Sequence, residues 1–174
     1  MTTTAHALLD AGILTLRIDN PVTFKSGIVS PVYLDNRLLT FHPQAWHTVI
    51  EGLQALVAPL AERFEIIAGI ETAGISHSAA LAYVMGKPSV FVRKQPKEHG
   101  LKKRVEGGDV NGRRVLLLED QISTGGSSLS GVQALRDEGA IVTDCIAITS
   151  YGFADAHAAF NAVDVALHVL APFE

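Results

Sequence analysis

Cysteine is nearly absent from this 174-residue sequence, which contains Cys145 and no other. A disulfide framework within the chain is therefore excluded, and a reduced, cytoplasmic setting is the simplest interpretation. Apolar runs of membrane-spanning length are also lacking. The first residues, MTTTAH, contain neither the basic nor the apolar region of a signal peptide. We expect a cytoplasmic protein that does not associate with a membrane.

An excess of positive charge is lacking too, because 14 lysines and arginines stand against 18 acidic residues, giving a net charge of −4. That balance argues against general nucleic-acid binding, so we expect no nucleic-acid partner. The cations are unevenly placed, since one short segment contains Arg93, Lys94, Lys97, Lys102, Lys103 and Arg104. Such a concentration can bind an anion. Taken alone, however, the charge pattern favours a solvated surface loop.

Internal repeats and linkers rich in proline or serine are absent as well. With 48% hydrophobic and 18% charged residues, the chain has the composition of a folded protein rather than a disordered one. Its length suits one domain with a hydrophobic core. We expect residues 1–174 to form a single domain.

Apolar runs and helical patterns alternate in the second half of the chain. Strands are predicted at residues 66–70, 89–93, 114–119 and 141–149, and helices at 75–85 and 127–138. Gly86 and Gly139 follow the two helices as C-terminal caps. This alternation predicts an α/β fold with a parallel sheet covered by helices on both faces. Ligands of such sheets bind at the carboxyl ends of the strands.

The first third of the chain has a different pattern. A helix is predicted over residues 3–11, and a longer one from Pro43, which Pro59 is expected to kink or shorten. Residues 24–37, between them, contain glycine and proline and predict a turn with extended flanks, forming a small cap on the sheet. The longer helix is expected to bury Trp46, Val49, Ile50, Leu53, Val57 and Leu60. We also expect Phe41, Trp46 and Phe91 in the core rather than against a substrate.

The most informative stretch is VLLLEDQISTGGSS, residues 115–128. A strand, a loop rich in glycine and serine, and a helix N-terminus together form an anion site, because backbone N–H groups and the helix dipole face the ligand. Glu119 and Asp120 would repel a phosphate placed beside them. A sugar phosphate removes the conflict, since the loop can hold the phosphate while the carboxylates accept hydrogen bonds from ribose hydroxyls. A plain helix cap is the alternative, and the whole pattern favours a binding site.

This segment resembles the motif by which type I phosphoribosyltransferases bind phosphoribosyl pyrophosphate (PRPP). Three further segments are similar to those of the orotate enzymes. FKSGIVSPVYLDNR at 24–37 resembles their N-terminal signature, and VRKQPKEHG at 92–100, followed by VEG at 105–107, resembles their mobile catalytic loop. YGF at 151–153 resembles a C-terminal variant of some members. The resemblance runs in order from about residue 8 to the end, and implies a type I phosphoribosyltransferase fold with a small N-terminal hood.

The resemblance implies an orotate phosphoribosyltransferase that makes orotidine 5′-monophosphate and pyrophosphate in pyrimidine (UMP) biosynthesis. It implies Mg²⁺ as cofactor, carried mainly by PRPP and water rather than by dedicated protein ligands. It also implies a homodimer in which the loop 93–108 contributes to the neighbouring site. The implied catalytic residues are Lys94, Lys97, His99 and Asp120. The implied orotate-binding residues are Lys25, Tyr33, Leu34 and Ser123. The implied PRPP-binding residues are Glu71, Thr72, Arg93, Lys94, Lys97, His99, Glu119, Asp120, Gln121, Ile122, Ser123, Thr124, Gly125, Gly126 and Ser127.

The chain departs from the family pattern at three places. Residues 149–153, TSYGF, contain no arginine where many members have one that binds orotate. Thr72 and Ala73 stand where some members have tyrosine and lysine, and Gln121 replaces a more usual apolar residue. Arg37 either pairs with Asp35 or lines the site, and the sequence favours neither.

Three other functions compete with this one. A type I enzyme for a purine or uracil is disfavoured by Lys25 and by the loop KEHG at 97–100. A non-enzymatic regulator that binds RNA would need a basic surface outside that loop, and the net charge of −4 gives it little support. A flavodoxin-like binding domain would leave both the acidic phosphate loop and the basic segment unexplained.

Overall fold

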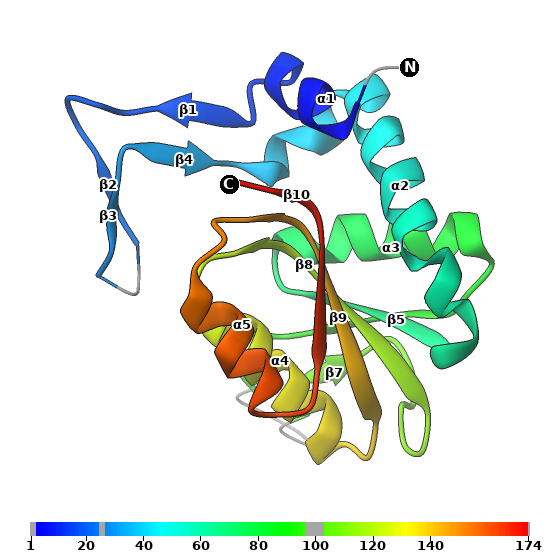
Figure 1. The fold of residues 1–174 in the computed structure, drawn as a ribbon. Helices are drawn as coiled ribbons and strands as arrows, with labels where there is room; N and C mark the ends of the chain where they lie inside the picture. The colour runs from blue at the N-terminus through cyan, green and yellow to red at the C-terminus, as the bar shows by residue number, and fades with distance from the viewer. Residues whose placement is uncertain (1–2, 25–26, 97–102, 174) are drawn as a thin grey trace.

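The computed structural model describes residues 3–24, 27–96 and 103–173 (Figure 1). Its centre is a six-stranded sheet with the strand order β10-β9-β8-β5-β6-β7. Within the described part of the chain, no helix is long and apolar enough to cross a membrane.

Five strands of the sheet run parallel. They are β5 (Ile66–Ile70), β6 (Ser89–Val92), β8 (Arg114–Ile122), β9 (Ile141–Ser150) and β10 (Ala166–Pro172). The predicted α/β fold is confirmed, with an addition at each edge of the sheet. The strand β10, which was not predicted from the sequence, pairs parallel with β9. The short strand β7 (Val105–Glu106), which the sequence analysis did not predict, pairs antiparallel with β6.

The strand predicted at 114–119 is longer in the structure. It continues to Ile122 because Gln121 and Ile122 pair with Thr149 and Ser150 of β9. Glu119 and Asp120 therefore lie within β8, and the phosphate loop shrinks to the residues between Ile122 and Gly126. The two acids are held by sheet hydrogen bonds rather than by a free loop, which fixes their positions relative to the loop that follows.

Helices cover both faces of the sheet (Figure 1), as predicted. On one face lie α2 (Pro43–Val57) and α3 (Ala73–Met85), and on the other α4 (Gly126–Asp137) and α5 (Ala154–Asn161). Side chains alternate between the faces along β8, because Leu116 and Leu118 belong to the core under α2 and α3, whereas Leu117 packs in the core under α4. Gly69 permits close packing of β5 on α3, since a Cβ there would lie 2.4 Å from the carbonyl oxygen of Gly74.

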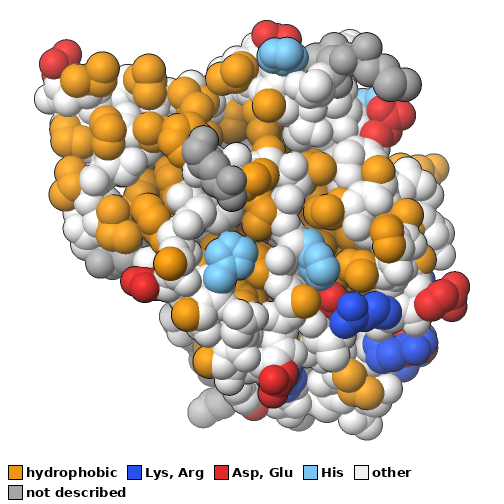
Figure 2. Space-filling view, in the orientation of Figure 1, with side chains coloured by type: hydrophobic (Ala, Val, Ile, Leu, Met, Phe, Trp, Pro, Cys, Tyr) orange, Lys and Arg blue, Asp and Glu red, His pale blue; other side chains and the backbone are white. Residues whose placement is uncertain are grey.

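The N-terminal segment forms the expected cap. It comprises α1 (Thr4–Asp10), then β1 (Leu14–Leu16), β2 (Val22–Thr23), β3 (Val29–Ser30) and β4 (Val32–Leu34), and the 3-10 helix η1 (Asn36–Phe41). β1 pairs antiparallel with β4, and β2 with β3, making an arm that extends beyond the sheet (Figure 1). Hydrophobic side chains gather on this arm, at the upper left of Figure 2, where Leu16, Ile18 and Val29 are exposed.

Pro59 shortens α2, as expected, but several side chains are less buried than predicted. α2 ends at Val57, where the chain continues as the 3-10 helix η2 (Ala58–Arg63), with Pro59 in its first turn. Leu60 is half-buried as a result. Phe41 is 83% exposed and does not belong to the core. As the last residue of η1, it contacts the ring of His42 edge-on instead of packing under α2. Trp46 and Phe91 are half-buried, and Trp46 packs against the core.

Candidate active site

The candidate active site lies at the carboxyl ends of β5, β8 and β9, under the N-terminal cap. Two cavities open here, of about 410 Å³ and about 470 Å³. They share four lining residues, Phe24, Tyr33, Gln121 and Ser127. The two cavities therefore adjoin, and together they join the loop after β8 to the cap.

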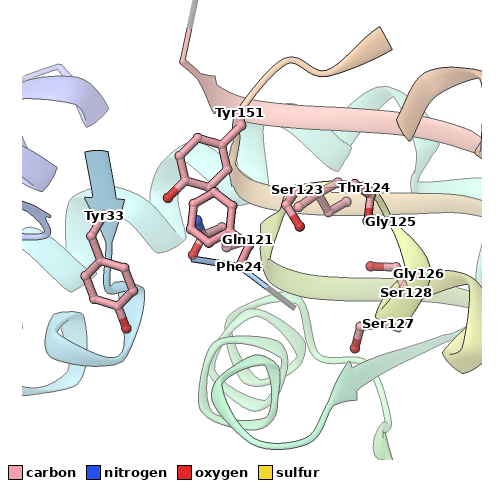
Figure 3. A pocket seen from close by; sticks show the side chains of 11 residues that line it. Phe24, Tyr33, Gln121, Ser123, Thr124, Gly125, Gly126, Ser127, Ser128 and Tyr151 are labelled. Carbon is pink, nitrogen blue, oxygen red and sulfur yellow. The ribbon is translucent and has the colours of Figure 1, made fainter. Parts of the chain in front are cut away.

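The first cavity is lined by the loop between β8 and α4. Figure 3 shows the residues from Ser123 to Ser127 on one side of it, and Phe24, Gln121 and Tyr151 clustered on another. The N-cap residue of α4 is Gly125, which has no side chain to bind the first turn, so the backbone N–H groups there can bind an anion. Gly125 has a positive φ of 81°, which lets the chain turn from strand to helix there. This loop has the geometry of a phosphate site.

The second cavity is lined by the acid pair. Glu119 is 6% exposed, and its Oε1 accepts a hydrogen bond of 3.2 Å from the backbone N–H of Asp120. Burial raises the pKa of Glu119 well above its usual range, and the neighbouring Asp120 charge adds to that effect. Glu119 consequently holds a proton more readily than an ordinary glutamate. A ligand that brings hydroxyl donors or a cation would favour its ionised form.

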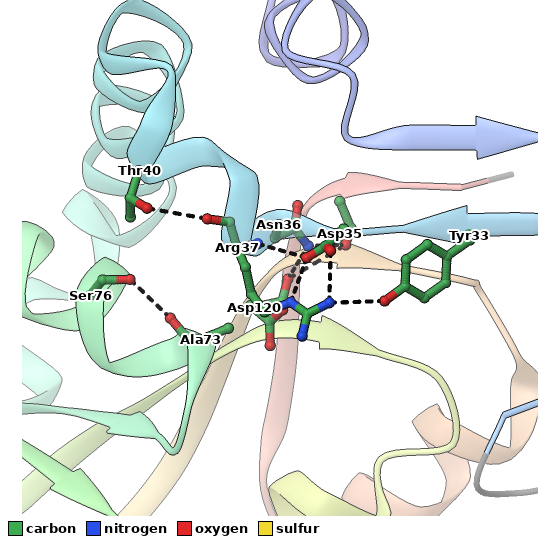
Figure 4. A network of polar contacts seen from close by, with 9 residues as sticks. Tyr33, Asp35, Asn36, Arg37, Thr40, Ala73, Ser76 and Asp120 are labelled. Atoms are coloured by element: carbon green, nitrogen blue, oxygen red, sulfur yellow. Dashed lines mark hydrogen bonds and ion pairs between the residues drawn. The ribbon is translucent and has the colours of Figure 1, made fainter.

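The cap lines the second cavity with Tyr33, Leu34, Asp35 and Arg37, and Arg37 lies close to Asp120 (Figure 4). Arg37 donates to Asp35 at 2.6 Å from Nε and 2.7 Å from Nη2, and also donates to the Tyr33 hydroxyl at 3.1 Å. The hydrogen bond from Arg37 holds the pKa of Asp35 below its usual value. Both alternatives for Arg37 hold, because it pairs with Asp35 and lines the cavity.

An aromatic cluster closes the side of the first cavity. The rings of Phe24 and Tyr151 lie 4.9 Å apart, and those of Tyr151 and Phe153 are stacked at 5.8 Å. The Tyr151 hydroxyl donates to the Val32 carbonyl at 3.3 Å, which ties β9 to the cap. Burial raises the pKa of Tyr151. Aromatic side chains such as Phe24 and Tyr151 can pack against an aromatic base.

The basic segment reaches the second cavity through Lys94, which lines it together with Glu71 and Thr72. The backbone N–H of Lys94 donates to Glu71 at 2.9 Å. Arg93 lines neither cavity and lies 3.9 Å from Glu106. Lys25, Lys97 and His99 lie outside the described residues.

Most of the predicted site residues in the described part of the chain thus come together. Leu34 lines the second cavity, and Ile122 to Gly126 line the first. Phe24, Asp35 and Tyr151 also line the cavities but were not predicted to bind substrate. The position of Tyr151 directly after β9 was an available signal, because ligands gather at the carboxyl ends of parallel strands.

The fold and this site define a phosphoribosyltransferase, and residues 43–158 match the family described as the phosphoribosyl transferase domain. The chain is 40% identical over 170 residues to the orotate phosphoribosyltransferase of Coxiella burnetii, covering 98% of this chain and 81% of the relative. It is 41% identical to that of Bacillus pumilus, covering 98% of this chain and 80% of the relative. A solved orotate phosphoribosyltransferase of Aeropyrum pernix, 25% identical, matches with a TM-score of 0.86 over 98% of this chain and 94% of that one. The chain therefore belongs to the orotate phosphoribosyltransferase family.

Proposed function

We propose that this chain transfers the 5-phosphoribosyl group from PRPP to orotate, giving orotidine 5′-monophosphate and pyrophosphate in pyrimidine (UMP) biosynthesis. One observation carries the proposal beside the family membership. A phosphate loop, an acid pair with a buried glutamate, and an aromatic cluster line two adjoining cavities, as a sugar phosphate and an aromatic base require. Neither a dinucleotide loop nor a Walker loop would place acids at that position.

We assign each residue a role according to the cavity that it lines. Ser123 to Ser127 would bind the 5′-phosphate of PRPP through backbone N–H groups and hydroxyls, with Gln121 and Ile122 shaping the approach. Glu119 and Asp120 would accept hydrogen bonds from the ribose hydroxyls. Orotate would lie between Tyr33, Leu34 and the aromatic cluster, near Ser123, with Lys25 facing its negative charge.

The chemistry breaks the bond from the ribose C1′ to a pyrophosphate oxygen and forms a bond from C1′ to a ring nitrogen of orotate, whose proton is released to water. Charge grows on the departing pyrophosphate, so cations placed there lower the barrier. We assign this role to Lys94, Lys97 and His99, with Glu71 and Thr72 on the same side of the site. Arg93 would join them by leaving Glu106.

We infer Mg²⁺ as the cofactor, carried largely by PRPP oxygens and water. No group of three or more His, Cys, Asp or Glu that could hold a metal ion occurs in residues 3–24, 27–96 and 103–173. The carboxylates of Glu119 and Asp120 are oxygen ligands of the kind this ion prefers, and they line the cavity that would hold the ribose. When bound, the ion would neutralise charge on the pyrophosphate.

We also propose a homodimer in which the loop 93–108 reaches the neighbouring site. Its support is an apolar surface on η1 and α3, where Tyr83 is 87%, Phe41 83% and Val84 47% exposed. Tyr83 and Val84 border a groove with Trp46 and Ile50 of α2. A second copy of the chain would cover this surface. We further propose that residues 1–174 form one domain. A cytoplasmic location is supported by Cys145, which is free and buried.

The loss of orotate ultraviolet absorbance tests the proposed reaction. Purified protein is mixed with PRPP and Mg²⁺, and hypoxanthine, adenine and uracil are tried in parallel. We expect PRPP-dependent loss of orotate alone, and a severe decrease in the Asp120→Asn variant. Turnover of another base would reassign the substrate, and PRPP binding without turnover of any base would favour a regulator.

A further inference from the structure

Asn36 lies between the two residues of the Asp35–Arg37 ion pair, but its side chain points away from the cavity into the protein (Figure 4). It is fully buried, at 0% exposure. Its Nδ2 donates one hydrogen bond of 2.8 Å to the backbone carbonyl of Asp120 and another of 2.8 Å to the Thr149 hydroxyl. One amide group thus joins the cap to both β8 and β9, at the floor of the site.

These two hydrogen bonds hold the segment 33–37 at a fixed distance from Asp120, and this distance matters for the proposed reaction. The carbonyl that Asn36 binds belongs to Asp120, whose carboxylate is assigned to the ribose. The segment that Asn36 anchors carries Tyr33 and Leu34, which are assigned to orotate. The Thr149 hydroxyl also lies 3.4 Å from the Asp120 carbonyl oxygen, so Asn36, Asp120 and Thr149 all contact one another. The ribose side and the base side of the site are therefore connected through Asn36.

A second buried polar residue, His77, lies next to Asn36. The Oδ1 of Asn36 is buried and has no hydrogen-bond partner among the described residues. The backbone of Asn36 lies against the His77 imidazole and favours its protonated form. The indole N–H of Trp46 donates to His77 Nδ1 at 3.0 Å. Because an indole can only donate, neutral His77 carries its proton on Nε2. Asn36 therefore contacts the proposed site through its side chain and the buried His77 through its backbone.

We infer that Asn36 is a positioning residue: it holds the orotate-side segment 33–37 at a fixed separation from Asp120, so that the base meets C1′ of the ribose in a reactive geometry. The inference rests on the proposed function, and specifically on the roles of Asp120 and Tyr33. A small displacement of reacting groups has large kinetic effects, on the order of 100-fold for about 1 Å. Loss of Asn36 should therefore reduce turnover more than it reduces PRPP affinity.

The variants are Asn36→Ala, which removes both hydrogen bonds, and the matched pair Thr149→Val and Thr149→Ser, of which only Thr149→Ser keeps the hydroxyl. For each, circular dichroism reports folding, calorimetry the affinity for PRPP with Mg²⁺, and the orotate assay kcat and KM. We expect Asn36→Ala to lower kcat by about 10- to 100-fold while PRPP affinity changes by less than about threefold. Thr149→Val should show a smaller loss, and Thr149→Ser should restore it. The double variant should be close to Asn36→Ala, because the Asn36–Thr149 hydrogen bond is lost in both and only the 3.4 Å contact of Thr149 with Asp120 is lost in addition.

The outcomes separate the inference from the proposed function. If the wild-type chain turns over no base, the proposed function fails and the inference fails with it. If the wild type turns over orotate and Asn36→Ala keeps its kcat, the inference alone is wrong. Equal losses in kcat and PRPP affinity would also overturn it, since they indicate a general structural role. Should Asn36→Ala not fold, equal kcat values for Thr149→Val and Thr149→Ser would decide against the inference.

Discussion

Glu119 combines a buried carboxyl group with a charged neighbour, and its stability effect depends on pH. Because its pKa is raised in the folded state, the stability it contributes is present below its unfolded pKa, about 4.3, and is lost as pH rises through the folded value. Glu119→Gln cannot ionise, so this variant should become progressively more stable than the wild type as pH rises. Each unit of pKa shift corresponds to about 1.4 kcal/mol.

Thermal unfolding between pH 4 and pH 9 measures this difference for Glu119→Gln. Glu65 is a control of opposite sign, because hydrogen bonds from Arg114 lower the pKa of its exposed carboxyl group. Glu65→Gln should therefore be less stable than the wild type above about pH 4.3, with a difference that stays constant up to pH 9 and shrinks only as pH falls through the lowered folded value. A difference between Glu119→Gln and the wild type that stayed constant with pH would show that Glu119 does not titrate in this range.

His77 should make the stability of the protein depend on pH in a second way, with stability lost as pH falls. Burial lowers its pKa, while the Asp120 charge and the Asn36 backbone oppose that effect. The group therefore contributes stability above its unfolded pKa of about 6.5, and that stability is lost as pH falls toward the folded value, by up to about 1.4 kcal/mol per pH unit. Protonation of Nδ1 would also place a donor against the indole N–H of Trp46.

We expect the wild type to lose stability between pH 7 and pH 5 more steeply than His77→Asn, whose side-chain oxygen can still accept from Trp46. Chemical denaturation at each pH gives the two slopes. His157→Asn, at an exposed histidine on α5, is the matched control and should follow the wild type. Parallel curves for His77→Asn and the wild type would remove His77 from the pH dependence.

Single polar residues were the hardest features to predict from the sequence. Glu119 and Asp120 were recognised because they stand beside a glycine-rich loop, which gives them a chemical context. Asn36 and His77 stand beside no such motif, and the partners of Asn36 are 84 and 113 residues away along the chain. Phe41 was wrongly assigned to the core because its apolar side chain says nothing about the direction in which η1 ends.

At the scale of elements, the loop between β8 and α4 depends on the conformation of Gly125. Its φ of 81° is strained for any other residue, and a Cβ there would lie 3.0 Å from the buried ring of Phe160. Gly125→Ala should therefore displace the loop from the phosphate position. We expect the affinity for PRPP to fall by at least about tenfold, which corresponds to about 1.4 kcal/mol, within the range of such strain.

Calorimetry with PRPP and Mg²⁺ checks the Gly125→Ala prediction. Gly86→Ala is the matched control, because Gly86 also has a positive φ, of 63°, but a Cβ there would meet nothing within 4 Å. Gly86, at the end of α3, lines neither cavity of the site, so its variant should lose some stability and keep PRPP affinity. Unchanged affinity in Gly125→Ala would mean that the phosphate binds elsewhere.

The main elements followed from the sequence because hydrophobic periodicity and glycine caps are local signals. The strands β5, β6, β8 and β9 and the helices α3 and α4 lie where the alternation placed them. The ends of β8 and β9 were underestimated, since Asp120 and Gln121 of β8 and Ser150 of β9 are polar and the two strand ends are ordered by pairing with each other. Strand β7 has two residues, too few to give a period, and exists because β6 offers it a free edge.

At the scale of the whole molecule, the site is built from two parts that the chain order separates. The sheet supplies the phosphate loop and the acids, while the cap supplies Tyr33, Asp35 and Arg37. Contacts such as Tyr151 with Val32 hold the two parts together. Neither part alone encloses a substrate, so movement of the cap relative to the sheet would change both cavities at once.

The exposed apolar surface on η1 and α3 is the predicted dimer interface. If a second copy covers this surface, Tyr83→Glu places a charge in an apolar interface and should turn a dimer into monomers, with loss of activity because the loop 93–108 can no longer reach its neighbour. Light scattering after gel filtration gives the mass. Ile18→Glu, at a residue that is 75% exposed on the N-terminal arm, is the matched control and should remain dimeric.

Mixing inactive Lys97→Ala with inactive Asp120→Asn should restore activity, because some mixed dimers contain one site with an intact loop and an intact acid. A wild-type monomer, or no recovery on mixing, would contradict a shared site, whereas dissociation of Ile18→Glu alone would move the interface to the arm.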